Sequence, residues 1–206
     1  MDVGARPVGR RALLVEVADP AACYADLVRR RGAGELAAVE IVPGAGTVLL
    51  DGVEDREAVA ARLSEWSPGW SARGGPGAAE GRLVEITVRY RGGDLPDVAD
   101  LWGTSVEAVV DRLSAVEYRV AFCGFAPGFA YLTGLPAELA VPRLDTPRTR
   151  VPAGSVGLAG GYAAIYPTAS PGGWRLVGET DIALFDVDAD PPALLTPGTR
   201  VRLPAR

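Results

Sequence analysis

The second half of this 206-residue chain is a series of short β-prone runs separated by glycine and proline, and this pattern constrains the fold more than any other feature. The runs occupy residues 118–122, 155–160, 162–167, 174–178, 182–187 and 199–203. Short strands with frequent turn signals are typical of a β-barrel or a β-sandwich. We therefore expect the second half of the chain to be mainly β.

The first part of the chain carries a different pattern, which predicts a small α+β unit. The expected elements are a strand at 11–17, a helix from Pro20 to about Arg31, strands at 37–42 and 47–51, and a helix at about 54–66. Asp19 followed by proline is a typical helix start, because the carboxylate caps a free backbone N–H group and proline fits the first turn. Pro43 to Gly46 predicts the hairpin turn between the two later strands.

Residues 67–81 are rich in glycine, alanine, proline and serine and predict a linker. We place a domain boundary there, which gives an α+β domain at 1–81 and a mainly-β domain at 82–206. The second domain is expected to begin with an alternating strand at 83–90 and two helices at about 96–102 and 105–115. Thr104 and Glu107 have the spacing of a capping box for the second helix.

Charge and composition exclude several functions. The net charge of −5 opposes binding to nucleic acid. No apolar run approaches the roughly 18 residues that cross a bilayer, and the arginine-bearing start lacks an apolar leader core, so we expect a cytoplasmic protein with no membrane contact. Cys23 and Cys123 fit reduced thiols. The chain has no histidine, which excludes histidine-based catalytic triads and histidine-bound metal, and we expect no metal site.

Three stretches carry the candidate chemistry, and the first is the loop at 122–136. Its glycines and prolines interrupt a row of aromatic residues that includes Phe125 and Phe129. Such a loop either lines a cavity with its rings or plugs the mouth of a barrel with core side chains. Composition alone leaves both interpretations open.

The second stretch, 141–157, holds Arg143, Arg148 and Arg150 among prolines. Proline restricts the backbone, so guanidinium groups are held at a lower entropic cost. Three such groups are able to bind phosphate or carboxylate through forked hydrogen bonds. The alternative is structural, with these arginines pairing with Asp145 or with carbonyl groups of exposed turns.

The third stretch, 165–180, contains an expected tight turn at Ser170–Gly173 that leads into Trp174. Glycine-rich turns present backbone N–H groups to anions. The glycine spacing of a phosphate-binding loop is absent from this stretch. The lysine that such a loop needs is absent as well, since all 21 basic residues are arginine. Ser170 has no nearby base to make it a nucleophile.

These stretches resemble a known family. GFAPGFAYL (124–132), TPRTRVPAGSVGLAGG (146–161) and IYPTASPGGWRLVGET (165–180) are similar to the family that comprises the 5-oxoprolinase B subunit (PxpB), KipI and allophanate hydrolase subunit 1, of the carboxyltransferase subdomain C and D type. ALLVEV (12–17) and EIVPGAGTVLL (40–50) extend the resemblance to nearly the whole chain. Family members often carry a histidine shortly before the 118–122 strand, where this chain has Leu113.

The resemblance implies an α+β N-terminal domain followed by a cyclophilin-like β-barrel. It further implies a component of an ATP-dependent 5-oxoprolinase, a hydrolase that opens 5-oxoproline to L-glutamate. ATP, with Mg²⁺ as its companion ion, and a KipA-type partner, the C subunit, together with a third subunit are implied as well. Two alternatives come from the same family: a KipI-type inhibitor that binds a sensor histidine kinase, and a subunit related to allophanate hydrolase or urea amidolyase.

The resemblance also assigns candidate roles to residues of segment 119–178. The candidate catalytic residues are Arg148, Arg150 and Arg119. The candidate substrate- and anion-binding residues are Arg143, Ser155, Ser170, Phe125, Phe129, Tyr166 and Trp174.

Overall fold

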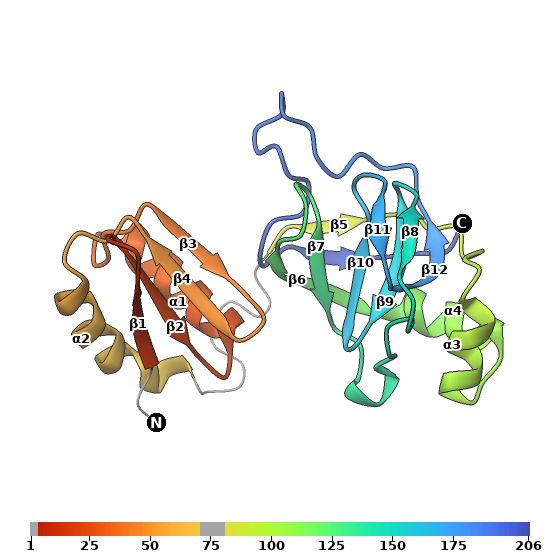
Figure 1. The fold of residues 1–206 in the computed structure, drawn as a ribbon, viewed down its shortest axis with the longest axis horizontal. Helices are drawn as coiled ribbons and strands as arrows, with labels where there is room; N and C mark the ends of the chain where they lie inside the picture. Colours follow the sequence, from red (N-terminus) through yellow and green to blue (C-terminus); the bar gives the residue numbers. More distant parts are fainter. Residues whose placement is uncertain (1–3, 71–80) are drawn as a thin grey trace. The chain divides into compact units, whose positions relative to one another are not determined.

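The computed structural model of the chain describes residues 4–70 and 81–206, which fall into two compact units, residues 1–81 and 82–206 (Figure 1). The expected linker at 67–81 lies mostly outside the described residues. Its first four residues, Ser67–Trp70, form a 3₁₀ helix, η1, that continues the preceding helix. None of the helices in the described part of the chain has the length and apolar character needed to cross a membrane.

The first unit is a four-stranded antiparallel sheet with two helices. Its elements are β1 (Gly4–Val8), β2 (Ala12–Glu16), α1 (Pro20–Gly32), β3 (Glu40–Pro43), β4 (Thr47–Asp51) and α2 (Arg56–Trp66), with the strands in the order β1-β2-β4-β3. The predicted strands and helices are confirmed, and β1 is an addition that the sequence did not predict. Alternation along β2 buries Leu13 and Val15 against Leu27 of α1 and Leu63 of α2.

Both helices of the first unit begin at capping aspartates. The side chain of Asp19 accepts a hydrogen bond from the Ala22 N–H group at 3.0 Å. Asp55 does the same for Ala58 at 3.0 Å. Each carboxylate satisfies a backbone donor that the first helical turn leaves unpaired, and this confirms the predicted start of α1.

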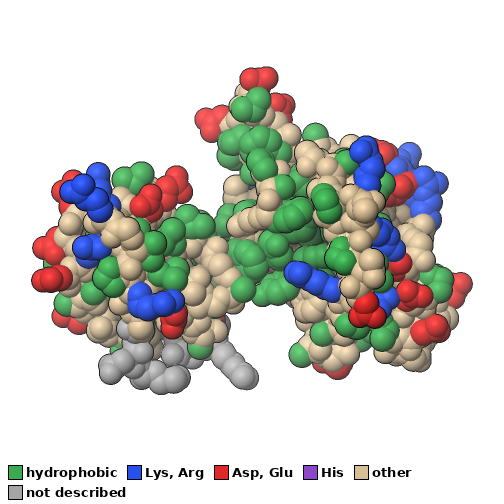
Figure 2. Space-filling view, in the orientation of Figure 1, with side chains coloured by type: hydrophobic (Ala, Val, Ile, Leu, Met, Phe, Trp, Pro, Cys, Tyr) green, Lys and Arg blue, Asp and Glu red, His purple; other side chains and the backbone are tan. Residues whose placement is uncertain are grey.

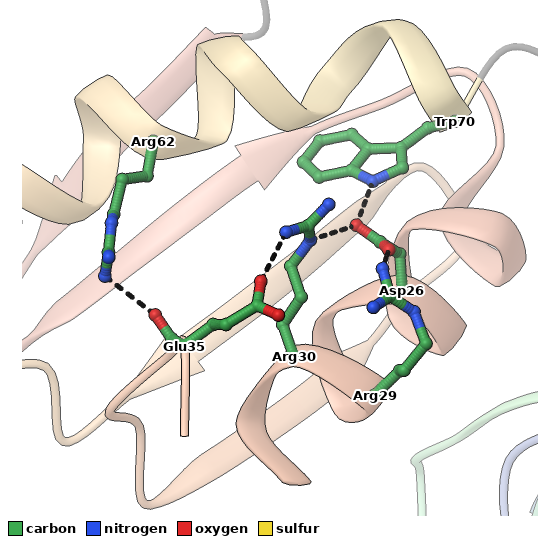
Figure 3. Close-up of polar contacts among 6 residues, drawn as sticks. All are labelled: Asp26, Arg29, Arg30, Glu35, Arg62 and Trp70. Carbon is green, nitrogen blue, oxygen red and sulfur yellow. Dashed lines mark hydrogen bonds and ion pairs between the residues drawn. The ribbon is translucent and has the colours of Figure 1, made fainter. Parts of the chain in front are cut away.

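A polar network ties α1 to the end of the first unit (Figure 3). The Asp26 carboxylate accepts hydrogen bonds from Arg30 Nε at 2.7 Å and from the buried Trp70 ring N–H at 3.1 Å. Arg30 also donates to the Glu35 side chain at 2.6 Å, and Arg62 of α2 donates to the Glu35 carbonyl at 2.7 Å. The network therefore holds η1 on α1, and α2 on the segment that follows α1.

The second unit contains a curled seven-stranded sheet in the order β12-β9-β10-β7-β6-β13-β5. Its elements are β5 (Leu83–Glu85), α3 (Leu95–Trp102), α4 (Val106–Ala115), β6 (Glu117–Cys123), β7 (Ala130–Thr133), η2 (Ala137–Leu139), β8 (Arg148–Val151), β9 (Ser155–Ala159), β10 (Tyr162–Ile165), β11 (Ser170–Gly172), β12 (Arg175–Glu179) and β13 (Arg200–Arg202). Strands β8 and β11 form a separate two-stranded sheet.

The curled sheet returns on itself beyond its two edges. Past the end of β5, the backbone of Arg89 exchanges hydrogen bonds of 2.9 and 3.0 Å with Glu179 of β12 at the opposite edge. The apolar core of the second unit lies inside this curl and includes Val120, Leu158 and Val201. The mainly-β character of this unit is confirmed, whereas its cyclophilin-like description stays a prediction.

Several local predictions in the second unit are wrong. The expected loop at 122–136 contains strand β7, and the expected strand at 83–90 is regular only over β5, Leu83–Glu85. Residues 182–187 form no strand, because Leu184 is the single buried side chain of this run. Phe185 forms only an isolated β-bridge with Ala193. The expected tight turn at Ser170–Gly173 is mostly the short strand β11, which finds its partner in β8. Ser105 caps α4 in place of the expected Thr104, because its hydroxyl accepts the Ala108 N–H bond at 3.2 Å.

Candidate functional site: arginines beside a buried aromatic cluster

Strands β9 and β10 bury both of their faces, and this creates a second apolar cluster outside the curl. Along β10, Ala163 and Ile165 point into the main core, whereas Ala164 and the following Tyr166 belong to the outer cluster. Val151 of β8 covers this outer face. Alternation along a strand explains the division, since successive side chains point to opposite faces.

The outer cluster is aromatic, and we call it the aromatic cluster. Its rings are those of Phe122, Phe125, Phe129, Tyr131, Tyr162, Tyr166 and Trp174. Phe129 lies at the centre, with edge-to-face contacts at centroid distances of 5.1 Å to Phe125 and 5.3 Å to Tyr166. Such pairs add about 1 kcal/mol each beyond the area they bury. Phe129, Tyr166 and Trp174 are buried, so these three expected wall residues are packed core side chains in the structure.

Phe125 is the exception within the aromatic cluster. Its side chain is 63% exposed, and its backbone has a φ of 71°, the left-handed region that side chains other than glycine rarely adopt. Local hydrogen bonds hold this conformation, with the Ala126 N–H donating to the Gly124 carbonyl at 2.9 Å and the Phe129 N–H donating to the Ala126 carbonyl at 3.0 Å. The loop thus combines the two interpretations offered by the sequence. The Phe129 ring is a buried core side chain, whereas the Phe125 ring is exposed to solvent.

Arg148 is held at the edge of the aromatic cluster by Asp94. One guanidinium nitrogen of Arg148 donates to both Asp94 carboxylate oxygens, at 2.6 and 2.8 Å, and another donates to the Trp174 carbonyl at 3.2 Å. Asp94 is only 6% exposed and also accepts the Leu176 N–H bond at 2.6 Å. A buried carboxylate requires such partners, so the pair neutralises much of the charge of Arg148 and fixes its direction.

The positive charges of Arg143 and Arg148 both affect the pKa of the Tyr166 hydroxyl. Burial raises the pKa of Tyr166, and the positive charge of Arg143, a backbone hydrogen bond from Trp174 and the charge of Arg148 offset part of that rise. Tyr166 is therefore a neutral hydroxyl at physiological pH, with two guanidinium groups close enough to influence it. Arg143 itself is exposed, so it remains open to an anionic ligand.

Arg150 and Ser170 complete this edge of the unit. Arg150 lies two residues after Arg148 on β8, and alternation places both arginines on the same face of that strand. Arg150 is exposed. Ser170 pairs with Val151 across β8 and β11, and its hydroxyl is buried without a hydrogen-bond partner among the described residues. A buried hydroxyl of this kind calls for an explanation, and a bound polar group is one.

Two expected site residues differ from the others. Arg119 lies away from β8, and Ser155 contributes a backbone hydrogen bond. Arg119 is on β6, opposite Thr133 of β7 and Arg200 of β13, and its guanidinium donates to the Gly198 carbonyl at 3.0 Å. Ser155 begins β9 and is buried, and its carbonyl accepts the Tyr166 N–H bond at 2.9 Å. The structure thus brings Arg143, Arg148 and Arg150 to one region around β8 and gives Arg119 a different neighbourhood.

Sequence reasoning missed Asp94, which the pattern showed only as one acidic residue before a helix. Its partner Arg148 is 54 positions away, and the segment before α3 reaches β12 because the Gly92 N–H donates to the Val177 carbonyl at 3.1 Å. Leu113, at the position where the family often has histidine, is a buried core residue of α4, and its carbonyl accepts the Tyr118 hydroxyl at 3.2 Å. Among the described residues no group of three acidic, cysteine or histidine side chains has the arrangement of a metal site.

Comparison with known proteins identifies relatives of this chain. Residues 3–195 match the family model of the carboxyltransferase domain, subdomain C and D. The 5-oxoprolinase B subunit of Escherichia coli O157:H7 is 42% identical over 167 residues, which cover 80% of this chain and 76% of that protein. The 5-oxoprolinase B subunit of Haemophilus influenzae is 49% identical over 126 residues, 60% of this chain and 59% of that protein.

Solved structures show the same fold. A crystal structure of the protein TTHA0988 superimposes with a TM-score of 0.76 and 36% identity, covering 95% of this chain and 40% of that chain. The urea amidolyase of Kluyveromyces lactis superimposes with a TM-score of 0.72 and 20% identity, covering 99% of this chain and 15% of that chain, and this likeness concerns the fold alone. The chain therefore spans less than half the length of both of these solved chains.

Proposed function

Because the chain belongs to the carboxyltransferase-domain family of subdomain C and D, with 5-oxoprolinase B subunits among its relatives, we propose that it is the B subunit of an ATP-dependent 5-oxoprolinase. The complex would hydrolyse the cyclic amide of 5-oxoproline to give L-glutamate. The observation that carries this proposal is the 42% identity that extends over 80% of the chain.

The geometry around β8 supports a role in binding anions. 5-Oxoproline carries a carboxylate, ATP carries phosphates, and guanidinium groups bind both through forked hydrogen bonds. Arg143 and Arg150 are exposed, so they are the side chains that we propose contact these groups. Arg148 is already paired with Asp94, and we propose that it shapes the site by fixing the position of β8 beside Tyr166.

The proposed reaction uses ATP as a co-substrate. The lactam carbonyl oxygen takes the terminal phosphoryl group, water attacks the activated carbon, and the C–N bond breaks to leave glutamate, phosphate and ADP. Fixed guanidinium groups stabilise the negative charge that develops on the transferring oxygens. The buried hydroxyl of Ser170, which lacks a protein partner among the described residues, is a suitable donor to such an oxygen. A magnesium ion would enter with the nucleotide phosphates, its usual mode of binding.

The site on this chain is one part of a larger active site. The name of its relatives as B subunits supports an assembly of several chains. We propose a KipA-type protein, the C subunit of such an enzyme, and a third subunit as partners in the cytoplasm, and we expect the isolated chain to be inactive. Arg119, which lies apart from β8, is then a candidate for contacts with a partner or for a structural role.

The direct test is glutamate formation by the reconstituted complex. The wild-type chain, mixed with its partner subunits, 5-oxoproline, ATP and Mg²⁺, is expected to release glutamate only when ATP is present. Arg150→Ala should lower this rate about a hundredfold, the effect typical of losing one donor to developing charge. Arg112→Ala, an exposed arginine on α4, is the matched control and should retain the wild-type rate. A complete complex that forms no glutamate would overturn the proposal.

A further inference from the structure

Three arginines near β8 differ in how far their charge is available to a ligand. The guanidinium of Arg148 is bound by the Asp94 carboxylate at 2.6 and 2.8 Å and by the Trp174 carbonyl at 3.2 Å. An anion that binds Arg148 must displace this buried carboxylate, which depends on its partner. Within the described residues, the side chains of Arg143 and Arg150 have no ion pair or hydrogen bond. The free cationic groups of the site are therefore those two.

Arg143 is held in place through the backbone on both sides of it. The Pro142 carbonyl accepts a hydrogen bond from Arg175 Nε at 3.1 Å, and the Leu144 N–H group donates to the Gly173 carbonyl at 2.8 Å. These two bonds fix the backbone at Arg143 against the start of β12, while its side chain remains exposed. The guanidinium is thus confined to one neighbourhood and still accessible to a ligand.

An exposed aromatic ring lies near the same tyrosine as Arg143. The ring of Phe125, which is 63% exposed, has its centroid 6.5 Å from that of Tyr166. Arg143 is close enough to the Tyr166 hydroxyl for its charge to oppose the rise in pKa that burial causes. Around β8, β10 and β12 in the view of Figure 2, arginine side chains lie next to hydrophobic ones. A small ligand with one apolar part and one anionic group fits such a combination.

We propose that Asp94 determines which anion this site accepts. By holding Arg148, it leaves Arg143 to bind the carboxylate of 5-oxoproline and disfavours the polyphosphate of ATP at the same position. A carboxylate carries one negative charge, which one forked guanidinium matches, whereas a triphosphate carries several and is repelled by the Asp94 carboxylate. The ring methylene groups of 5-oxoproline would lie against Phe125. This inference rests on the proposed function, and it leaves Arg150 for the transferring phosphoryl group.

The first experiment measures binding to the reconstituted complex without ATP, so that no turnover occurs. Its probes are 5-oxoproline and 2-pyrrolidinone, which has the same lactam ring without the carboxylate. The wild type should bind 5-oxoproline at least about tenfold more tightly, as expected for hydrogen bonds between charged groups. Arg143→Ala should abolish this preference, whereas Arg112→Ala, which changes an exposed arginine on α4, should keep it.

A second experiment tests Asp94 by competition at the same site, with tripolyphosphate added to the complex loaded with 5-oxoproline. Asp94→Asn removes the negative charge and keeps an oxygen for the Leu176 N–H group. Tripolyphosphate should then displace 5-oxoproline at about a tenfold lower concentration than it does from the wild type, because Arg148 is released and the repulsion is gone. Adding Arg148→Gln to this variant should remove the gain, which shows that Asp94 acts through Arg148.

The inference is overturned by a wild type without the preference, by a preference that survives Arg143→Ala, or by Asp94→Asn that resists tripolyphosphate as the wild type does. If Asp94→Asn does not assemble, the wild-type competition is the test: tripolyphosphate that displaces 5-oxoproline at an equal or lower concentration overturns the inference. A complex that binds as expected but forms no glutamate with ATP defeats the proposed function alone. Glutamate formation without an Arg143-dependent preference defeats this inference alone.

Discussion

Asp94 and Arg148, 54 positions apart, form an ion pair in which one guanidinium nitrogen donates to both carboxylate oxygens at 2.6 and 2.8 Å. Asp94 is buried, whereas the Arg148 side chain is 33% exposed. The pair joins the segment before α3 to β8, and the Asp94 bond to the Leu176 N–H group adds β12. One buried carboxylate therefore sets the position of the arginine around which the candidate site is built.

Loss of this pair should lower stability more than loss of a surface pair. Asp94→Ala is expected to reduce the free energy of unfolding by about 2 kcal/mol, because the Leu176 N–H group and the Arg148 guanidinium lose their partner. Asp97→Ala removes an exposed carboxylate that pairs with Arg175 at 2.9 Å and should cost less than about 1 kcal/mol. Urea denaturation of both variants measures the difference.

A double-mutant cycle then separates the pair from the general cost of each truncation. Asp94→Ala, Arg148→Ala and the double variant should show a coupling of about 1 kcal/mol or more, as contacting charged residues do. Additive effects within about 0.3 kcal/mol would show that the two side chains do not stabilise each other.

The backbone at Gly172 should be intolerant of any side chain. A Cβ at this position would overlap the Tyr166 hydroxyl, which is buried in the aromatic cluster. Gly172→Ala is therefore expected to displace Tyr166 and to lower the free energy of unfolding by about 1–3 kcal/mol, the usual cost of overpacking. Near-ultraviolet circular dichroism should report the altered packing of the tyrosine and tryptophan rings.

Gly173 offers a matched control one residue away. A Cβ there would find its nearest neighbour, the Leu144 carbonyl oxygen, at 3.5 Å, which is an ordinary contact. Gly173→Ala should leave the aromatic spectrum and the stability close to those of the wild type. Equal effects of the two substitutions would mean that the Tyr166 overlap is not the cause.

The sequence predicts best where the signal is local. Asp19 and Asp55 sit directly before their helices, and alternation identifies the buried face of β2, so the first unit follows from neighbouring residues. Strand β7 was hidden inside the aromatic loop at 122–136, because glycines and prolines flank its four residues. Strand β11 is only three residues long and exists through its pairing with β8, which no local pattern reveals.

The candidate site was predictable in its residue types but not in its arrangement. The arginine-rich stretch before and within β8 was evident, yet the partner of Arg148 proved to be Asp94, on another element, in place of the nearby Asp145. Burial of Phe129 and Trp174 depends on Val151 of β8 covering the outer face of the curled sheet. Such contacts are long-range, so a pattern read along the chain carries little information about them.

Acid should weaken the second unit partly through Glu117. Its carboxylate accepts two hydrogen bonds from Arg200, at 2.7 and 2.8 Å, and one from Arg202 at 3.0 Å. The hydrogen bonds from Arg200 are the main cause that lowers the pKa of Glu117 from its usual 4.5 to about 2. A lowered carboxylate pKa contributes stability that is fully present above the usual value and is lost as pH falls from about 4.5 toward 2.

Glu117→Gln tests that pH window. At pH 7 the variant should unfold at a lower urea concentration than the wild type, and the difference between them should shrink as the pH falls through this range. Glu138→Gln, on η2 of the same unit, is the control and should follow the wild type at every pH. A difference between Glu117→Gln and wild type that stays constant from about pH 7 to about pH 2.5 would show that the loss comes from packing and not from the ionised carboxylate beside Arg200.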